Sequence, residues 1–239
     1  MHIRSLRLLH DSFPTRNFYP FNLDIFQKSD VMEFSRPVTF FIGENGSGKS
    51  TLLRAIARAS TIHIWEEREG NRDPHNPYEN LLHTSLRIEW TDGKVPGSFF
   101  ASEIFRHFTE ILDAWGIADP GYLNYFGNSS LVLKSHGQSH MTFFENRFNR
   151  KGLYLVDEPE NALSPKMQLG LLRLLRQLIS RGDVQFIIAT HSPLLLAFPD
   201  AEIFSFDAVP IRKIGYEDTD YFRIYWDFLN NRKKYLDEI

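Results

Sequence analysis

The feature that most constrains this chain is a glycine-rich segment, residues 43–51, which follows an apolar run and opens a helical pattern. It reads Gly-Glu-Asn-Gly-Ser-Gly-Lys-Ser-Thr. Glycines let backbone N–H groups turn inward around an anion, and the N-terminus of a following helix adds its positive end. The segment has the spacing of a phosphate-binding loop, which predicts a strand–loop–helix unit inside an α/β domain.

The polar side chains of this loop indicate a nucleotide with a divalent cation. A lysine placed like Lys49 reaches the β- and γ-phosphates, and a hydroxyl placed like Ser50 ligates Mg²⁺. A glycine-rich turn without a ligand is the alternative, but the intact spacing between strand and helix disfavours it. We therefore expect ATP and Mg²⁺ as ligands. The expected nucleotide-binding residues are Asn45, Gly46, Ser47, Gly48, Lys49, Ser50 and Thr51.

Two adjacent carboxylates end a second apolar run. Residues 153–156 read Leu-Tyr-Leu-Val, and Asp157 and Glu158 follow them. Consecutive side chains at the tip of a strand point to different faces. Asp157 can therefore serve Mg²⁺ through its water shell, while Glu158 faces an attacking water. A simple polar turn is the alternative, which the phosphate loop in the same chain disfavours.

A histidine follows a third apolar run. Residues 186–189 form the run, and His191 stands two positions after it. A histidine at the end of a buried strand can sense the γ-phosphate, although a loop histidine without a catalytic role explains this residue equally well on its own. Its place after the first two motifs favours the sensor. The expected catalytic residues are Lys49, Glu158 and His191.

In order and spacing, these three motifs resemble those of the ABC-type ATPases, including their Walker A and Walker B sequences. That family carries a Leu-Ser-Gly-Gly-Gln signature shortly before its Asp-Glu strand. Here residues 134–139 read Lys-Ser-His-Gly-Gln-Ser, with His136 in place of a glycine. The matching residues are Ser135, Gly137 and Gln138. The resemblance implies a helix whose N-terminus caps the γ-phosphate held by a second subunit; an incidental turn is the alternative.

The chain departs from the family pattern at two places. The family has a glutamine between the phosphate loop and the signature that links Mg²⁺ to the helical lobe, but residues 52–134 contain no glutamine. Glu103 is the candidate substitute, which would make Ser50, Asp157 and Glu103 the metal-binding residues. After the Asp-Glu pair, Ser164 stands where the family often has an aspartate.

Within the family, the sequence around the motifs resembles the soluble branch of RecF-like and SMC-like ATPases. Residues 157–165 and 190–193 carry this likeness, and short bacterial predicted ATPases without an assigned role resemble the chain more closely. Fewer than a hundred residues separate the phosphate loop from the signature. A long coiled-coil arm does not fit in that interval, so the resemblance implies a head domain without arms.

The expected fold is an ABC-type P-loop fold of the α/β class, with a largely parallel core sheet, an N-terminal antiparallel β region and an inserted helical lobe. The core lobe would comprise residues 1–100 and 151–239, and the helical lobe residues 101–150. Apolar runs predict strands at residues 38–42, 153–156 and 186–189. Helical patterns predict helices at 49–59 and 165–181. Residues 85–90 and 94–100 flank Asp92-Gly93, which predicts a hairpin.

Composition narrows the functional class. The chain has 239 residues and a formal net charge of −3, which disfavours a protein that binds nucleic acid over its whole surface. It has no cysteine, which excludes thiolate metal sites. No apolar run is long enough to span a bilayer, so we expect a cytoplasmic protein without direct membrane insertion.

Three functional classes are open at this point. The first is an ATPase that closes into an ATP-sandwiched homodimer and controls a nucleic-acid or effector-protein partner. The second is an ATP-dependent binding switch with little turnover. The third is the cytoplasmic ATPase subunit of a membrane transporter.

Overall fold

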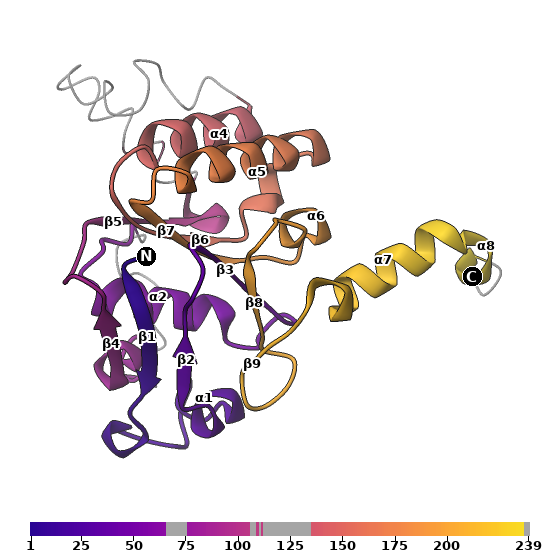
Figure 1. Cartoon of the computed structure of the whole chain (residues 1–239). Helices are drawn as coiled ribbons and strands as arrows, with labels where there is room; N and C mark the ends of the chain where they lie inside the picture. The colour runs from indigo at the N-terminus through magenta and orange to yellow at the C-terminus, as the bar shows by residue number, and fades with distance from the viewer. Residues whose placement is uncertain (66–75, 106–108, 110, 112–134, 237–239) are drawn as a thin grey trace.

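The computed structural model describes residues 1–65, 76–105, 109, 111 and 135–236 (Figure 1). Most of the helical lobe expected at residues 101–150 therefore lies outside the described residues, as does most of the loop expected at 66–82. Of the apolar face predicted for that lobe, Phe105 is buried in the core. Phe108, Leu112 and Trp115 belong to the residues that are not described.

A six-stranded sheet forms the centre of the molecule, in the order β5-β6-β7-β3-β8-β9. The strands from β5 to β8 are parallel, and β9 pairs antiparallel with β8. Their bounds are β5 Gly97–Ala101, β6 Gly152–Asp157, β7 Val184–Ala189, β3 Val38–Ile42, β8 Glu202–Ser205 and β9 Arg212–Lys213. Every residue of β3, β6 and β7 is buried, as expected for parallel strands covered on both faces. The three predicted strands and the parallel core are confirmed.

Helices cover the two faces of this sheet (Figure 1). Neighbouring residues of β3 show the division: Phe41 packs in the cluster that contains Leu52 and Ile56, whereas Phe40 packs in the cluster that contains Leu171. Helix α2, Lys49–Ala59, covers the first face. Helices α4, His136–Arg147, and α5, Pro165–Ile179, cover the second, and the short α6, Pro193–Leu196, packs against α5.

The ends of both predicted helices follow from their capping residues. Helix α2 has the predicted bounds. Helix α5 begins at Pro165 after the N-cap Ser164, whose Oγ accepts a hydrogen bond from the backbone N–H of Met167. It ends two residues before the predicted position, and Gly182 follows with a φ of 76°. Ser164 thus acts as a helix cap in this chain.

A second, three-stranded antiparallel sheet has the order β2-β1-β4, with β1 at Ile3–Leu8, β2 at Val31–Glu33 and β4 at Leu86–Trp90. This confirms the N-terminal antiparallel region. The hairpin predicted around Asp92-Gly93 is wrong, because β4 pairs with β1 while β5 pairs parallel with β6. Strand β5 buries Phe99 and Phe100 in the core. A two-stranded hairpin could not bury these side chains to the same extent, so it would lack the stabilising free energy of that burial.

The remaining elements are short or lie at the surface. They are α1 Asp24–Lys28, η1 His10–Ser12, η2 Leu82–Ser85, η4 Pro159–Ala162, η5 Tyr216–Asp218, α7 Asp220–Asn230 and α8 Arg232–Leu236. Helix α7 extends away from the body of the molecule, and none of its residues is buried (Figure 1). None of the described helices is long and apolar enough to cross a membrane.

One buried side chain joins the two sheets. Gln185 of β7 is fully buried, and its Oε1 accepts hydrogen bonds from the backbone N–H groups of His2 and Ile3, each at 2.7 Å. Its Nε2 donates to the carbonyl of Ile3 at 3.2 Å. A single amide therefore satisfies three backbone groups that would otherwise be buried without partners.

Replacing this amide should destabilise the fold. In Gln185→Leu the two N–H groups lose their acceptor, which should lower the free energy of unfolding by at least about 2 kcal/mol. The exposed Gln177 of α5 provides the control, because Gln177→Leu should change stability by no more than about 0.5 kcal/mol. Urea unfolding curves of the two variants measure the difference, and equal midpoints would show that the amide does not hold the sheets together.

Candidate functional site

The phosphate loop connects β3 to α2 at the carboxyl end of β3. Gly46 and Gly48 have φ values of 81° and 101°, which lie in the left-handed region that glycine adopts without strain. A Cβ at Gly48 would in addition lie 2.9 Å from Cζ of Phe26. The conformation therefore requires glycine at this position. Asn45 and Gly46 are exposed at the tip of the loop, and Thr51 lies in the first turn of α2, where its Oγ1 contacts the hydroxyl of Tyr19.

Lys49 is buried and folded back onto the loop. Its Nζ donates to the carbonyl of Gly43 at 2.6 Å and to the carbonyl of Glu44 at 2.9 Å. Burial lowers the pKa of Lys49, and the nearby carboxylates of Glu158 and Asp157 oppose that change. The loop thus holds a partly desolvated cation at the point where a polyanion would bind.

An unsatisfied hydroxyl also fits a phosphate. Within the described part of the chain, the buried Oγ of Ser47 has no hydrogen-bond partner. A buried polar atom without a partner is uncommon and calls for an explanation. Together with Lys49 and the positive end of α2, this hydroxyl makes the loop suitable for a nucleotide phosphate.

The predicted metal-binding pair is assembled beside the loop. The Ser50 hydroxyl donates to Oδ1 of Asp157 at 3.0 Å. Asp157 ends β6 with only 6% of its surface exposed, and burial raises its pKa to about 6. A hydroxyl and a carboxylate are oxygen ligands suited to Mg²⁺, which usually binds few protein groups and keeps several waters.

Glu103 lies in a different setting from this pair. Its carboxylate is 84% exposed and stands 3.6 Å from the guanidinium of Arg54 on α2. Among the residues that the structure describes, no group of three His, Cys, Asp or Glu side chains is arranged to hold a metal ion. The role of Glu103 as a magnesium ligand stays a prediction.

Glu158 occupies a strained turn directly after Asp157. Its φ and ψ are 47° and 55°, a left-handed conformation that non-glycine residues rarely adopt. Two hydrogen bonds hold its backbone. Its N–H donates to the carbonyl of Ala189 at 2.9 Å, and its carbonyl accepts from the Ser102 hydroxyl at 2.6 Å. The turn directs the two neighbouring carboxylates to different partners.

The partners of the Glu158 carboxylate are Asn161 and His191. Nδ2 of Asn161 donates to Oε2 at 2.8 Å, and Nε2 of His191 lies 3.4 Å from Oε1. Oε2 is therefore held by a hydrogen bond from Asn161, and Oε1 faces the ring of His191. This is the geometry expected of a group that must present a carboxylate to a water in a fixed direction.

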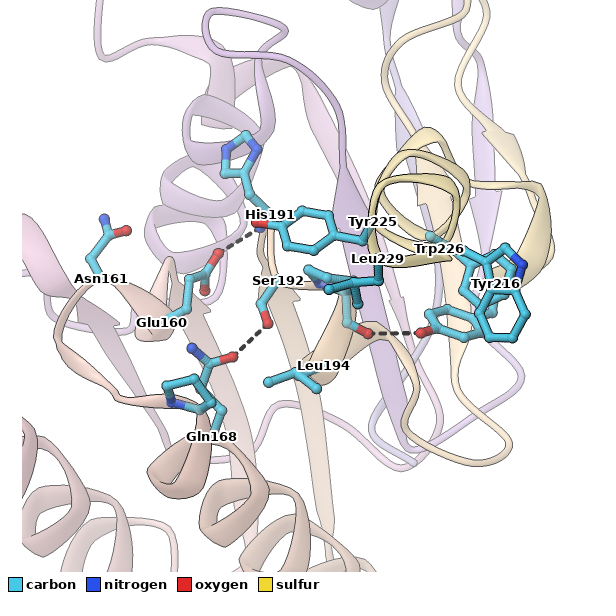
Figure 2. Close-up of a pocket in the computed structure, with 13 residues that line it drawn as sticks. Glu160, Asn161, Gln168, His191, Ser192, Leu194, Tyr216, Tyr225, Trp226 and Leu229 are labelled. Atoms are coloured by element: carbon cyan, nitrogen blue, oxygen red, sulfur yellow. Dashed lines mark hydrogen bonds between the residues drawn. The ribbon is translucent and has the colours of Figure 1, made fainter. Parts of the chain in front are cut away.

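His191 is held by residues that the sequence motifs did not indicate. Its backbone N–H donates to Oε1 of Glu160 at 2.5 Å (Figure 2), and its ring Nδ1 lies 2.8 Å from the hydroxyl of Tyr221. Burial raises the pKa of Glu160, and the bond from His191 opposes that rise. Glu160 and Asn161 follow the Asp-Glu pair with only Pro159 between, so their place in the sequence could have indicated them. No sequence signal pointed to Tyr221, which comes from α7.

The signature residues form the start of α4. Ser135 is the N-cap, and Ser135 and Gln138 form a reciprocal capping box with bonds of 3.4 and 3.2 Å. A Cβ at Gly137 would lie 2.7 Å from the carbonyl of Ala162 and 2.8 Å from Sδ of Met167. Glycine therefore lets α4 approach η4 and α5 closely. The predicted helix opening at this motif is present in the structure.

A cavity of about 620 Å³ opens beside His191. One side is formed by the loops and helices that carry Glu160, Asn161 and Gln168, and the other by Tyr225, Trp226 and Leu229 of α7 (Figure 2). The cavity therefore adjoins the loop that carries His191 and is lined on one side by the largely apolar face of α7.

Comparisons with known proteins agree with this geometry. Residues 16–89 match a family described as AAA domain, and residues 133–197 match one described as AAA domain, putative AbiEii toxin, Type IV TA system. The thiamine import ATP-binding protein ThiQ of Haemophilus influenzae is 29% identical over 166 residues, which cover 64% of this chain and 74% of that protein. The phosphate import ATP-binding protein PstB 2 of Streptococcus pneumoniae is 28% identical over 189 residues, 67% of this chain and 68% of that protein.

Solved structures show the same fold. CbiO1 from Clostridium perfringens, part of an ABC transporter complex, superposes with a TM-score of 0.54 at 16% identity, covering 99% of this chain and 100% of that one. A putative metal-chelate type ABC transporter superposes with a TM-score of 0.54 at 16% identity over 94% of this chain and 88% of that one.

Fold and site together define a P-loop nucleotide hydrolase: the phosphate loop, the Asp-Glu pair and the histidine follow three adjacent parallel strands. The helix that opens at the signature residues and the matched relatives narrow the class. In motifs, fold and matched relatives the chain is similar to the ABC-type ATPases, as its sequence predicted.

The loop lysine supplies a direct test of the site. In Lys49→Ala the phosphates lose a charge-assisted donor, so ATP affinity should fall roughly ten- to hundredfold while the circular dichroism spectrum stays unchanged. Lys94 is the matched control, because its Nζ also donates to a backbone carbonyl, that of Ala59, but from an exposed position. Equal ATP affinities for the Lys49→Ala variant and the parent would contradict this assignment.

Proposed function

We propose that this chain binds ATP with Mg²⁺ and hydrolyses it, and that two copies close head to tail around two ATP molecules. The observation that carries the proposal is the arrangement of the Glu158 carboxylate, which is held by Asn161 and faces His191 beside the buried Lys49 and the Ser50–Asp157 pair. The parts needed for hydrolysis of a phosphoanhydride stand next to one another at one edge of the sheet.

The phosphate loop and the Ser50–Asp157 pair would hold the ligands. Lys49 leaves the carbonyls of Gly43 and Glu44 and donates to the phosphates, and Ser47 and the loop N–H groups complete the cradle. Ser50 would ligate Mg²⁺ directly and Asp157 through a water. Bound Mg²⁺ would neutralise charge on the phosphate oxygens.

Glu158 would act as the general base. It accepts a proton from water as the water oxygen bonds to the γ-phosphorus and the bond from that phosphorus to the ADP oxygen breaks. Asn161 orients the carboxylate for this step, and His191 lies beside it. Lys49 stabilises the negative charge on the departing phosphoryl oxygens.

The second subunit would complete each site. The N-terminus of α4 carries Ser135 and Gly137, and the contacts described for these residues run within α4 and to η4 and α5. A helix N-terminus meets an anion favourably, so α4 of one copy can cap the γ-phosphate bound by the other. Ser135, Gly137 and Gln138 therefore belong to the composite site by this proposal.

The partner is proposed to be an effector protein or a nucleic acid in the cytoplasm, as the resemblance of residues 157–165 and 190–193 to RecF-like and SMC-like ATPases implies. The match over residues 133–197 to the family described as a putative toxin supports an effector. Two relatives are named as import ATP-binding proteins, which makes a transporter subunit the second candidate. Copurification with a membrane protein would favour that candidate.

Removing the base should separate binding from hydrolysis. Glu158→Gln keeps the shape of the side chain but cannot accept a proton, so the hydrolysis rate should fall about a hundred- to ten-thousandfold while ATP still binds. Sizing chromatography with Mg-ATP should then show an accumulated dimer. The exposed Glu33 of β2 provides the control Glu33→Gln. A Glu158→Gln variant with the parental rate would assign the base to another residue.

A parent protein that binds ATP but releases no phosphate over multiple turnovers would instead favour the binding switch. The Glu103 assignment bears on this choice, because Glu103 is the proposed substitute for the glutamine of the family.

A bulky cation at the signature should act across the dimer. Ser135→Arg should still bind ATP, because Ser135 contributes nothing to the site of its own subunit, yet it should neither dimerise on ATP nor hydrolyse it well. Mixed with Lys49→Ala protein, it forms a heterodimer with both lesions in one composite site, and the other site regains activity. Normal hydrolysis by Ser135→Arg alone would rule out a signature that acts on the partner's nucleotide.

A further inference from the structure

Tyr221 connects two functional loops through one hydroxyl group. Its hydroxyl donates to the carbonyl of Gly43 in the phosphate loop at 3.0 Å and lies 2.8 Å from Nδ1 of His191. The two rings also meet edge to face, with centroids 5.6 Å apart and an interplanar angle of 70°.

The setting of Tyr221 is not that of a core residue. It is half-buried in the first turn of α7, a helix with no buried residue. The start of this helix is fixed by its N-cap Thr219, whose Oγ1 accepts from the backbone N–H of Phe222 at 3.1 Å. Tyr221 is thus placed by a capped helix start, and its hydroxyl reaches into the site.

The proton of this hydroxyl determines the state of the histidine ring. Burial raises the pKa of Tyr221 to about 12, so the phenol keeps its single proton at neutral pH. That proton goes to Gly43, and the oxygen can therefore only accept from His191. Nδ1 of a neutral ring then carries the ring proton, and Nε2 presents its lone pair towards the Glu158 side of the site.

The hydrogen bond from Tyr221 also helps to hold the carbonyl of Gly43 in the phosphate loop. In the described structure this carbonyl accepts from Lys49 as well as from Tyr221. Once Lys49 turns to the phosphates, the Tyr221 hydroxyl is the described donor that still holds the carbonyl. Losing it would leave a backbone oxygen at the start of the loop without that partner.

We propose that Tyr221 is a positioning residue that couples the phosphate loop to His191, so that the placement of α7 controls ATP hydrolysis. The proposal rests on the proposed ATPase function. In it, Tyr221 touches neither nucleotide nor water and acts through the two residues that it holds.

The test is Tyr221→Phe, which removes the hydroxyl and keeps the ring. Tyr216→Phe is the matched control, because the Tyr216 hydroxyl also donates to a backbone carbonyl, that of Pro193, at 3.1 Å (Figure 2). We expect kcat to fall about tenfold in Tyr221→Phe and less than about twofold in the control. The thermal midpoints of the two variants should agree with each other.

A double-variant cycle identifies the route of the effect. When two residues act as one unit, the effects of their substitutions on kcat do not add. Adding Tyr221→Phe to His191→Ala should therefore lower kcat little further. The remaining loss should appear in KM and in the equilibrium affinity for Mg-ATP, because the Gly43 contact is still broken. A tenfold fall in kcat in both backgrounds, or none in either, would overturn the coupling.

A readout independent of turnover separates this proposal from the proposed function. Nitrogen-15 spectra of the His191 ring should show the Nδ1–H tautomer in the parent and a shift away from it in Tyr221→Phe. The Nε2–H tautomer in the parent would overturn the proposal even if ATP is hydrolysed. A parent that shows the expected tautomer but no hydrolysis would overturn the proposed function alone.

Discussion

The parallel pairing of β3, β6 and β7 is the constraint on which the site depends. Ala189, the last residue of β7, pairs with Phe41 on one side and with Asp157 on the other. The three strands consequently end at one level, and the phosphate loop, the Asp-Glu pair and His191 leave the sheet side by side. A slip of one residue would turn Asp157 to the opposite face and separate it from Ser50.

The buried charges of Lys49 and Asp157 also favour ligand binding at this edge of the sheet. Burial lowers the pKa of Lys49 and raises that of Asp157, so each group is held where its charge is less favoured than in water. A polyanion with a divalent cation compensates both, because each buried charge then gains an opposite partner. The strained backbone of Glu158 belongs to the same design, since stored strain of this kind concentrates at functional sites.

The sequence predicted the elements that local pattern controls. The apolar runs fixed β3, β6 and β7, and the predicted helix at 49–59 coincides with α2. The hairpin at Asp92-Gly93 failed because its turn residues carry no information about β6, whose pairing with β5 decides the topology. Tyr221 could not be predicted for a related reason: it meets Gly43 from the far end of the chain, and no motif spans that separation.

The projection of α7 from the body has a mechanical consequence. Tyr221 is the second residue of an 11-residue helix, whose length is about 16 Å, and the exposed Leu229 lies near the other end. If the helix moves as a rigid body about a point near its start, Tyr221 lies on the short side of that point, in the nucleotide site, and Leu229 lies on the long side, in solvent. A molecule that presses on the far end of α7 would then move the Tyr221 hydroxyl through a smaller distance but with greater force. By the coupling proposed for Tyr221, a force on the exposed end of α7 would reach the phosphate loop.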